Sequence, residues 1–167
     1  MVDMRVIAMC VDTTFNAYVV GSTVFYFFVS SPVMMKNLGR ERFVPLMMSL
    51  MRVYFTSICV ALSASLAATY MHCEGEITST TFLTQAAGLT CALINKFVIG
   101  PKALAAGKAS FEERKGKDKD GSLEKFAVEG GASTTKVWHQ TVVVFVFAML
   151  GGVLPHLYEL MSRVRDV

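Results

Sequence analysis

Ionisable side chains inside long apolar segments are the residues of this chain that could do chemistry, because a charge in a membrane segment is costly and needs a partner. Asp12 and Arg52 each lie about two turns into an apolar segment. A third apolar segment ends near the polar pair Asn95-Lys96, and a fourth begins near His139. We expect these side chains to gather in one interhelical polar cluster, made of Asp12, Arg52, Asn95, Lys96 and His139.

Such a cluster could be a proton relay, an ion path or a binding site for a lipid phosphate. The alternative interpretation is structural. Lys96 would then extend to the membrane surface, His139 would lie in the headgroup layer, and Asn95 would hydrogen-bond to another helix. The sequence leaves both interpretations open.

Two further histidines, His72 and His156, are expected at one membrane surface, at the ends of two apolar segments. Two histidines at the same depth could hold a b-type haem between helices. Their positions near the ends of the segments favour interfacial histidines instead. We therefore predict no cofactor at these residues.

The sequence contains one fragment of a metal-binding motif, at residues 118–123. Aligning Gly121 with the sixth position of a calcium loop puts Gly116 first and Ala127 twelfth, where Asp and Glu are required. The segment is therefore interpreted as a turn. Catalytic and nucleotide-binding motifs are absent, and the cysteines form no CxxC pair. We predict neither an enzyme nor a metal site.

Composition indicates the elements that must position these residues. The chain has 167 residues, of which 53% are hydrophobic and 17% charged, against about 25% charged residues in soluble domains. Four apolar stretches are long enough to span a membrane, at about 6–30, 44–70, 77–100 and 137–160. We expect an all-α, integral membrane four-helix bundle that forms one domain over residues 1–167, with its spans bounded in part by Ser31-Pro32 and by Pro101.

The basic residues are concentrated in two of the connections. Segment 31–43 carries three of them, and segment 102–136, whose first part should extend span three as a helix, carries eight. The positive-inside rule places both loops in the mitochondrial matrix, or in the cytosol for another membrane, with both termini on the opposite side. We expect anionic phospholipid, and no nucleic acid, as the counter-charge, with headgroup contacts at Lys36, Arg40, Arg42 and Lys102.

Small residues recur at helical spacing in three of the spans. Such residues let helix backbones approach closely, which drives packing in lipid. We expect them to serve packing within the bundle in spans two and three. The candidates are Ala61, Ala64, Ser65 and Ala68 in span two, Gly88 and Ala92 in span three, and Gly151-Gly152 in span four.

The stretch from Ala92 to Pro101, followed by Glu112-Glu113-Arg114-Lys115, resembles the transmembrane protein 205-like family. Members of that family are small four-span proteins in which an Asn followed by Gly-Pro leads from span three into a basic helix. The matching residues are Asn95, Gly100 and Pro101, and His139 falls where the family often has a histidine. Arg52 departs from the family pattern. The resemblance implies membrane residence, with trafficking or small-molecule resistance suggested for some members.

A small chain without catalytic motifs but with several packing faces is typical of a non-catalytic accessory subunit. We expect such a subunit in a large membrane complex, with a respiratory-chain or ATP synthase assembly of the mitochondrial inner membrane as its setting and other membrane subunits as its partners. The alternative is a free-standing membrane transport or trafficking protein. That alternative predicts a pocket or water path around Asp12, Arg52 and Asn95.

Overall fold

The computed structural model describes residues 4–77, 79–119 and 133–165, except for the side chains of 39–41, 114–119, 133–135 and 163–165. These residues are helical apart from the short turn before Thr80. The helices are α1 (Met4–Val24), η1 (Phe25–Ser30), α2 (Ser31–His72), α3 (Thr80–Ile94), η2 (Asn95–Ile99), α4 (Gly100–Lys119) and α6 (Ser133–Arg165).

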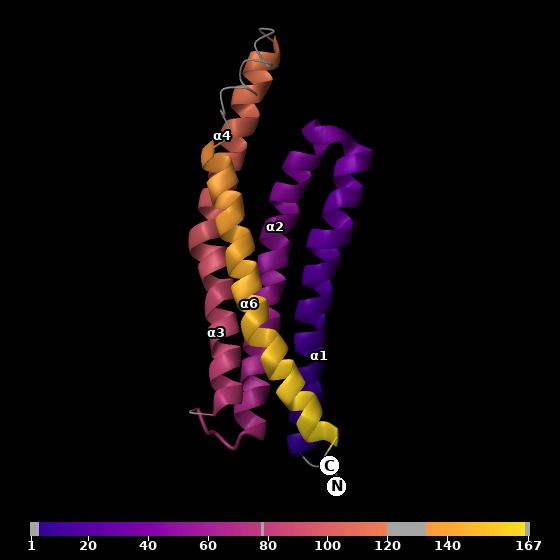
Figure 1. The fold of residues 1–167 in the computed structure, drawn as a ribbon, viewed down its shortest axis with the longest axis vertical. Coiled ribbons are helices and arrows are strands. Elements are labelled where there is room, and N and C mark those ends of the chain that lie inside the picture. Colours follow the sequence, from indigo (N-terminus) through magenta and orange to yellow (C-terminus); the bar gives the residue numbers. More distant parts are fainter. Residues whose placement is uncertain (1–3, 78, 120–132, 166–167) are drawn as a thin grey trace.

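Four helical segments are long and apolar enough to cross a membrane, which confirms the predicted four-helix membrane bundle. They cover residues 4–38, 42–72, 80–113 and 136–162. The chain reverses direction near residues 39–41, within α2, so that α1 and the second half of α2 form an antiparallel pair (Figure 1). The start of α1 and the end of α6 lie at the same end of the bundle (Figure 1).

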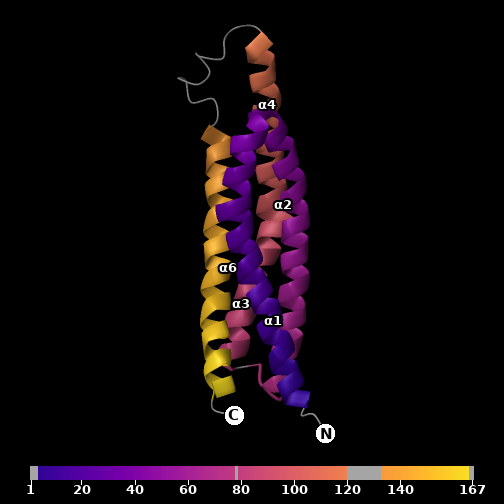
Figure 2. The same ribbon diagram turned by 90° about the vertical axis from the view of Figure 1, so that its right-hand side faces the viewer.

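The helix α6 joins the two halves of the bundle. It packs along α3 and α4 over most of its length and also contacts α1. Figure 1 shows it crossing obliquely from the side of α4 toward the start of α1, and Figure 2 shows α1 and α6 from the side. This crossing brings the C-terminal part of α6 to the residues at the start of α1.

The two expected proline boundaries do not end the helices. Ser31-Pro32 follows the π-helix η1, and Gly100-Pro101 follows the π-helix η2. In each case the residue before proline donates its N–H five residues back, from Ser31 to the Tyr26 carbonyl and from Gly100 to the Asn95 carbonyl. Proline lacks an N–H and clashes with the carbonyl four residues earlier in a regular α-helix, so a π turn before it lets the helix continue.

The glycine at the second of these turns is required by the geometry. A Cβ atom on Gly100 would lie 2.6 Å from the backbone oxygen of Asn95. Beyond it, α4 carries span three on to Lys119, so the predicted helical extension is present. The turn predicted at residues 118–123 is wrong at its start, because residues 118 and 119 still belong to α4, and its remainder from residue 120 on lies outside the described residues.

The close approach of α3 and α6 depends on two glycines. A Cβ atom on Gly152 would lie 2.7 Å from the backbone oxygen of Thr84 and 3.0 Å from the backbone nitrogen of Gly88. A Cβ atom on the neighbouring Gly151 would meet nothing within 4 Å. Of the neighbouring glycines Gly151 and Gly152, it is therefore Gly152 that allows the close packing of α6 against α3.

We predict that Gly152→Ala lowers the free energy of unfolding by about 1–3 kcal/mol, because the added methyl group meets backbone atoms that cannot rotate away. Gly151→Ala is the matched control, and it should leave stability unchanged or raise it by up to about 1 kcal/mol through helix propensity. Unfolding of the purified protein in SDS, followed by circular dichroism, measures both values. Equal stability of the two variants would contradict this account of the crossing.

Candidate functional site

The carboxylate of Asp12 lies at the centre of a buried polar site formed by all four spans. The buried residues of α1 recur every three or four positions, which identifies its inward face, and Asp12 and Asn16 both lie on that face. Ser65, Thr69 and His72 occupy one face of α2 at the same kind of spacing. We call the following residues the Asp12 cluster: Asp12, Asn16, Ser65, Thr69, His72, Thr81, Gln85 and His156.

The Asp12 carboxylate accepts hydrogen bonds at both oxygens. Oδ1 accepts from the Asn16 amide at 2.7 Å and from the Ser65 hydroxyl. Oδ2 accepts from the Thr69 hydroxyl at 2.9 Å, and the Nε2 atoms of His72 and His156 lie 2.9 and 3.0 Å from it. The carboxylate is therefore connected to α2 and α6 as well as to its own helix.

Both ring nitrogens of the fully buried His156 face acceptors. Its Nδ1 lies 3.0 Å from the Thr81 carbonyl, which cannot donate, so Nδ1 must carry a proton. Its Nε2 lies 3.0 Å from Oδ2 of Asp12, and a second proton is needed between these two atoms. That proton belongs either to an imidazolium beside a carboxylate or to a carboxylic acid beside a neutral imidazole.

In either form, Asp12 and His156 together carry no net charge. The third titratable group, His72, places Nε2 2.9 Å from Oδ2 of Asp12, and as a neutral ring it would donate its single proton there. The site therefore holds one proton more than an ionised carboxylate and two neutral imidazoles would hold. A net charge inside the bundle is thus avoided, which a buried site in a membrane requires.

His72 is the member of the cluster nearest to water. It is the last residue of α2 and is 8% exposed, whereas every other member is at 0%. Its second nitrogen, Nδ1, lies 3.6 Å from the Cys73 sulfur, a weak partner only. A chain of hydrogen bonds therefore leads from the end of the bundle through His72 and Asp12 to His156.

Two side-chain amides of the cluster keep spare acceptor atoms. The nitrogens of Asn16 and Gln85 donate to the Ser65 oxygen at 2.7 and 2.6 Å. Their oxygens, Oδ1 and Oε1, are buried without a hydrogen-bond partner among the described residues. A buried acceptor without a donor is rare in proteins, and it gives the site capacity for one more donor.

The cluster does not have the arrangement of a metal or haem site. Within the described ranges no group of three or more His, Cys, Asp or Glu side chains is placed to hold a metal ion. One carboxylate oxygen contacts both His72 and His156, which leaves no room for a macrocycle between the rings. The arrangement is suited to binding and passing a proton.

The predicted polar cluster is therefore wrong in composition. Asp12 contacts none of its expected partners and lies instead with His72 and His156, which were expected at the membrane surface. His72 is buried because α2 continues past the predicted span end to this residue, and His156, which lies inside the predicted fourth span, is buried because it faces Asp12 and the Thr81 carbonyl. A useful signal was the shared depth of Asp12, His72 and His156 at one end of their spans.

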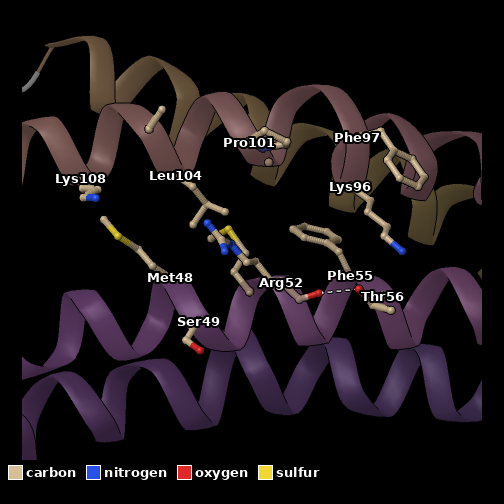
Figure 3. Close-up of a pocket in the computed structure, with 13 residues that line it drawn as sticks. Met48, Ser49, Arg52, Phe55, Thr56, Lys96, Phe97, Pro101, Leu104 and Lys108 are labelled. Carbon is tan, nitrogen blue, oxygen red and sulfur yellow. Dashed lines mark hydrogen bonds between the residues drawn. The ribbon is translucent and has the colours of Figure 1, made fainter.

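The other predicted members lie apart from one another at the basic end. The buried Asn95 donates to the Val142 carbonyl at 3.3 Å. Arg52 and Lys96 line a groove between α2 and the η2–α4 helix, where they lie on opposite walls (Figure 3). His139 is exposed and lines a different cavity.

That second cavity has a volume of about 480 Å³ and lies among η1, α2, α4 and α6. Its lining is mostly apolar and includes the methionines Met35, Met47, Met48 and Met51. The bundle is thus tightly packed around the Asp12 cluster at one end and hollowed at the other end.

Of the expected headgroup residues, Lys36, Arg42 and Lys102 are exposed, while the side chain of Arg40 lies outside the described residues. Lys102 holds its ammonium group 5.3 Å from the ring centroid of Trp138. A lysine ammonium over a tryptophan ring is an arrangement suited to the membrane interface, where tryptophan is enriched.

Comparison with known families gives a match. The family model described as "Domain of unknown function (DUF4149)" matches residues 14–112, which covers most of the first three spans. Asp12 and His156 both lie outside the matched range. Comparison with curated proteins and with solved structures gives no match.

Proposed function

This chain belongs to the family of the domain of unknown function DUF4149, whose description names no activity, and we propose from its buried site that it is a proton-linked membrane transport protein. The Asp12 cluster would be its proton-binding site. The observation that carries the proposal is the pair of acceptors around His156, which requires a proton between His156 and Asp12 inside the bundle.

The hydrogen-bond chain supplies a route for that proton. Histidine is the side chain that most readily gains and loses a proton between about pH 5 and 8. Once the proton shared by Asp12 and His156 has been lost, a proton arriving from water at Nδ1 of His72 releases the proton on Nε2 to Asp12, and Asp12 again shares a proton with His156. An intramembrane Asp–His chain of this kind is typical of pumps and transporters.

The two ends of the bundle support transport rather than a purely structural role. The Asp12 cluster occupies one end, and the apolar cavity of about 480 Å³ occupies the other. Between them along α1 and α2 lies a fully buried apolar layer of Val19, Ile58 and Leu62. Alternating access would require this layer to open when the cluster changes its protonation.

Proton movement in reconstituted vesicles tests the proposal. With a pH-sensitive dye trapped inside and a pH gradient imposed, vesicles that contain the protein should equilibrate faster than empty ones. Asp12→Asn should slow the protein-dependent rate by at least about tenfold, because the chain loses its proton acceptor. Glu76→Gln, the same change at an exposed residue of the α2–α3 turn, is the matched control and should retain the rate.

Thermal unfolding of both variants shows whether they are folded. If Asp12→Asn is unfolded, His72→Gln replaces it, since His72 lies at the edge of the cluster. Two results would contradict the proposal: a folded variant with the wild-type rate, or wild-type vesicles no faster than empty ones.

Several expectations from the sequence stay predictions. These are an accessory role in a respiratory-chain or ATP synthase assembly, the mitochondrial inner membrane as location, the absence of enzymatic activity and the resemblance to the transmembrane protein 205-like family. The Asp12 cluster favours the transport alternative over the accessory role, because packing alone does not require a buried proton.

We also propose that residues 31–43 and 102–136 face the matrix or cytosol, as the positive-inside rule predicts. A Lys36→Cys variant and an Ile77→Cys variant, with the four native cysteines replaced, test this orientation in intact membranes. An impermeant thiol reagent added from the matrix or cytosolic side should label position 36 and spare position 77. The reverse pattern would contradict the orientation.

A further inference from the structure

We propose that the groove between α2 and the η2–α4 helix binds an anionic phospholipid, with the headgroup phosphate held by Arg52 and attracted by Lys96 and Lys108 from either side along the groove. The groove has a volume of about 740 Å³. Figure 3 shows the three basic residues following one another along it, with Arg52 on the α2 wall between the two lysines of the opposite wall. The lysines are twelve residues apart (108 − 96), or roughly 18 Å along a helix.

Within the part of the chain that the structure describes, no carboxylate forms an ion pair with Arg52, Lys96 or Lys108. The ammonium group of Lys96 instead lies 5.0 Å from the ring centroid of Phe97. The hydrogen bond drawn in Figure 3 runs from the Thr56 hydroxyl to the backbone carbonyl of Arg52. It does not involve the Arg52 guanidinium.

The position of Arg52 favours a bound anion. Arg52 lies ten residues (52 − 42) inside the start of its span, which is roughly 15 Å along the helix, and its side chain is exposed on the outside of the bundle. An unpaired charge at such a depth is costly. A phosphate removes this cost because it accepts two parallel hydrogen bonds from a guanidinium and attracts the nearby lysines.

The rest of the groove suits a lipid rather than a soluble anion. Apolar side chains alternate with the cations along its walls, among them Met48, Phe55, Leu104 and Phe97. Phe97 is 65% exposed, so the groove opens on the lipid-facing side of a membrane span. An acyl chain can therefore lie against Phe55 and Phe97 while its headgroup contacts the basic residues.

Lipid binding to the purified full chain tests the proposal. Native mass spectrometry from micelles counts bound phosphatidylglycerol or phosphatidylcholine, and thermal unfolding is measured with the same lipids and with inorganic phosphate. We expect phosphatidylglycerol to bind and to raise the unfolding temperature, whereas phosphatidylcholine and inorganic phosphate have little effect.

Charge-removing variants locate the site. Arg52→Gln and Lys96→Gln should each bind phosphatidylglycerol about fivefold more weakly. Lys136→Gln removes the same charge from an exposed residue outside the groove and should bind like wild type. Arg52 and Lys96 support no described contact between helices, and the unfolding curve without added lipid verifies that the variants are folded.

Three outcomes would overturn the proposal. Equal binding of the two phospholipids would show that the groove does not select for charge. Stabilisation by inorganic phosphate alone would indicate a soluble anion instead. Equal losses for Lys136→Gln and Arg52→Gln would show a general surface attraction without a defined site.

Discussion

The structure depends on the contact between Asp12 and His156, which joins the first helix of the chain to the last. In lipid the hydrophobic effect does not draw helices together, so close packing and hydrogen bonds must do so. The carboxylate of Asp12 contacts three side chains of α2 and one of α6, and the Nδ1 proton of His156 continues the connection to α3. One shared proton keeps this four-helix junction free of net charge.

The glycine crossing and the polar cluster belong to one arrangement. Gly152 precedes His156 by one turn of α6, and Thr84 follows Thr81 by about one turn of α3. The contact that Gly152 permits with the Thr84 backbone therefore brings the next turn of α6 against the Thr81 carbonyl. A larger residue at the crossing would move the His156 ring away from its acceptor. The oblique path of α6 then carries the same ring across to Asp12.

Hydropathy and charge were sufficient to predict the four spans and the helical extension after Pro101, because both depend on local composition. The helix end was misjudged at Pro32, and the π turns before Pro32 and Pro101 were not predicted, since such a turn depends on carbonyl geometry that residue types do not reveal. The sequence also placed Arg52 and Asn95 in one predicted polar cluster, because the two residues lie at a similar depth in their spans. Rotation about the helix axes turns Asn95 inward and Arg52 outward, and that rotation depends on which helices are neighbours.

The measurement that tests the account most directly is the protonation of His156. Magnetic resonance of the protein in lipid, with ¹⁵N-labelled histidine and ¹³C-labelled aspartate, reports the protons on both groups at about pH 7.5, where free histidine is mostly neutral. Loss of signals in His156→Gln and Asp12→Asn assigns them. We expect Nδ1 of His156 to be protonated, together with either a protonated Nε2 or a carboxylic acid at Asp12. A His156 ring with a single proton beside an ionised Asp12 would contradict the account.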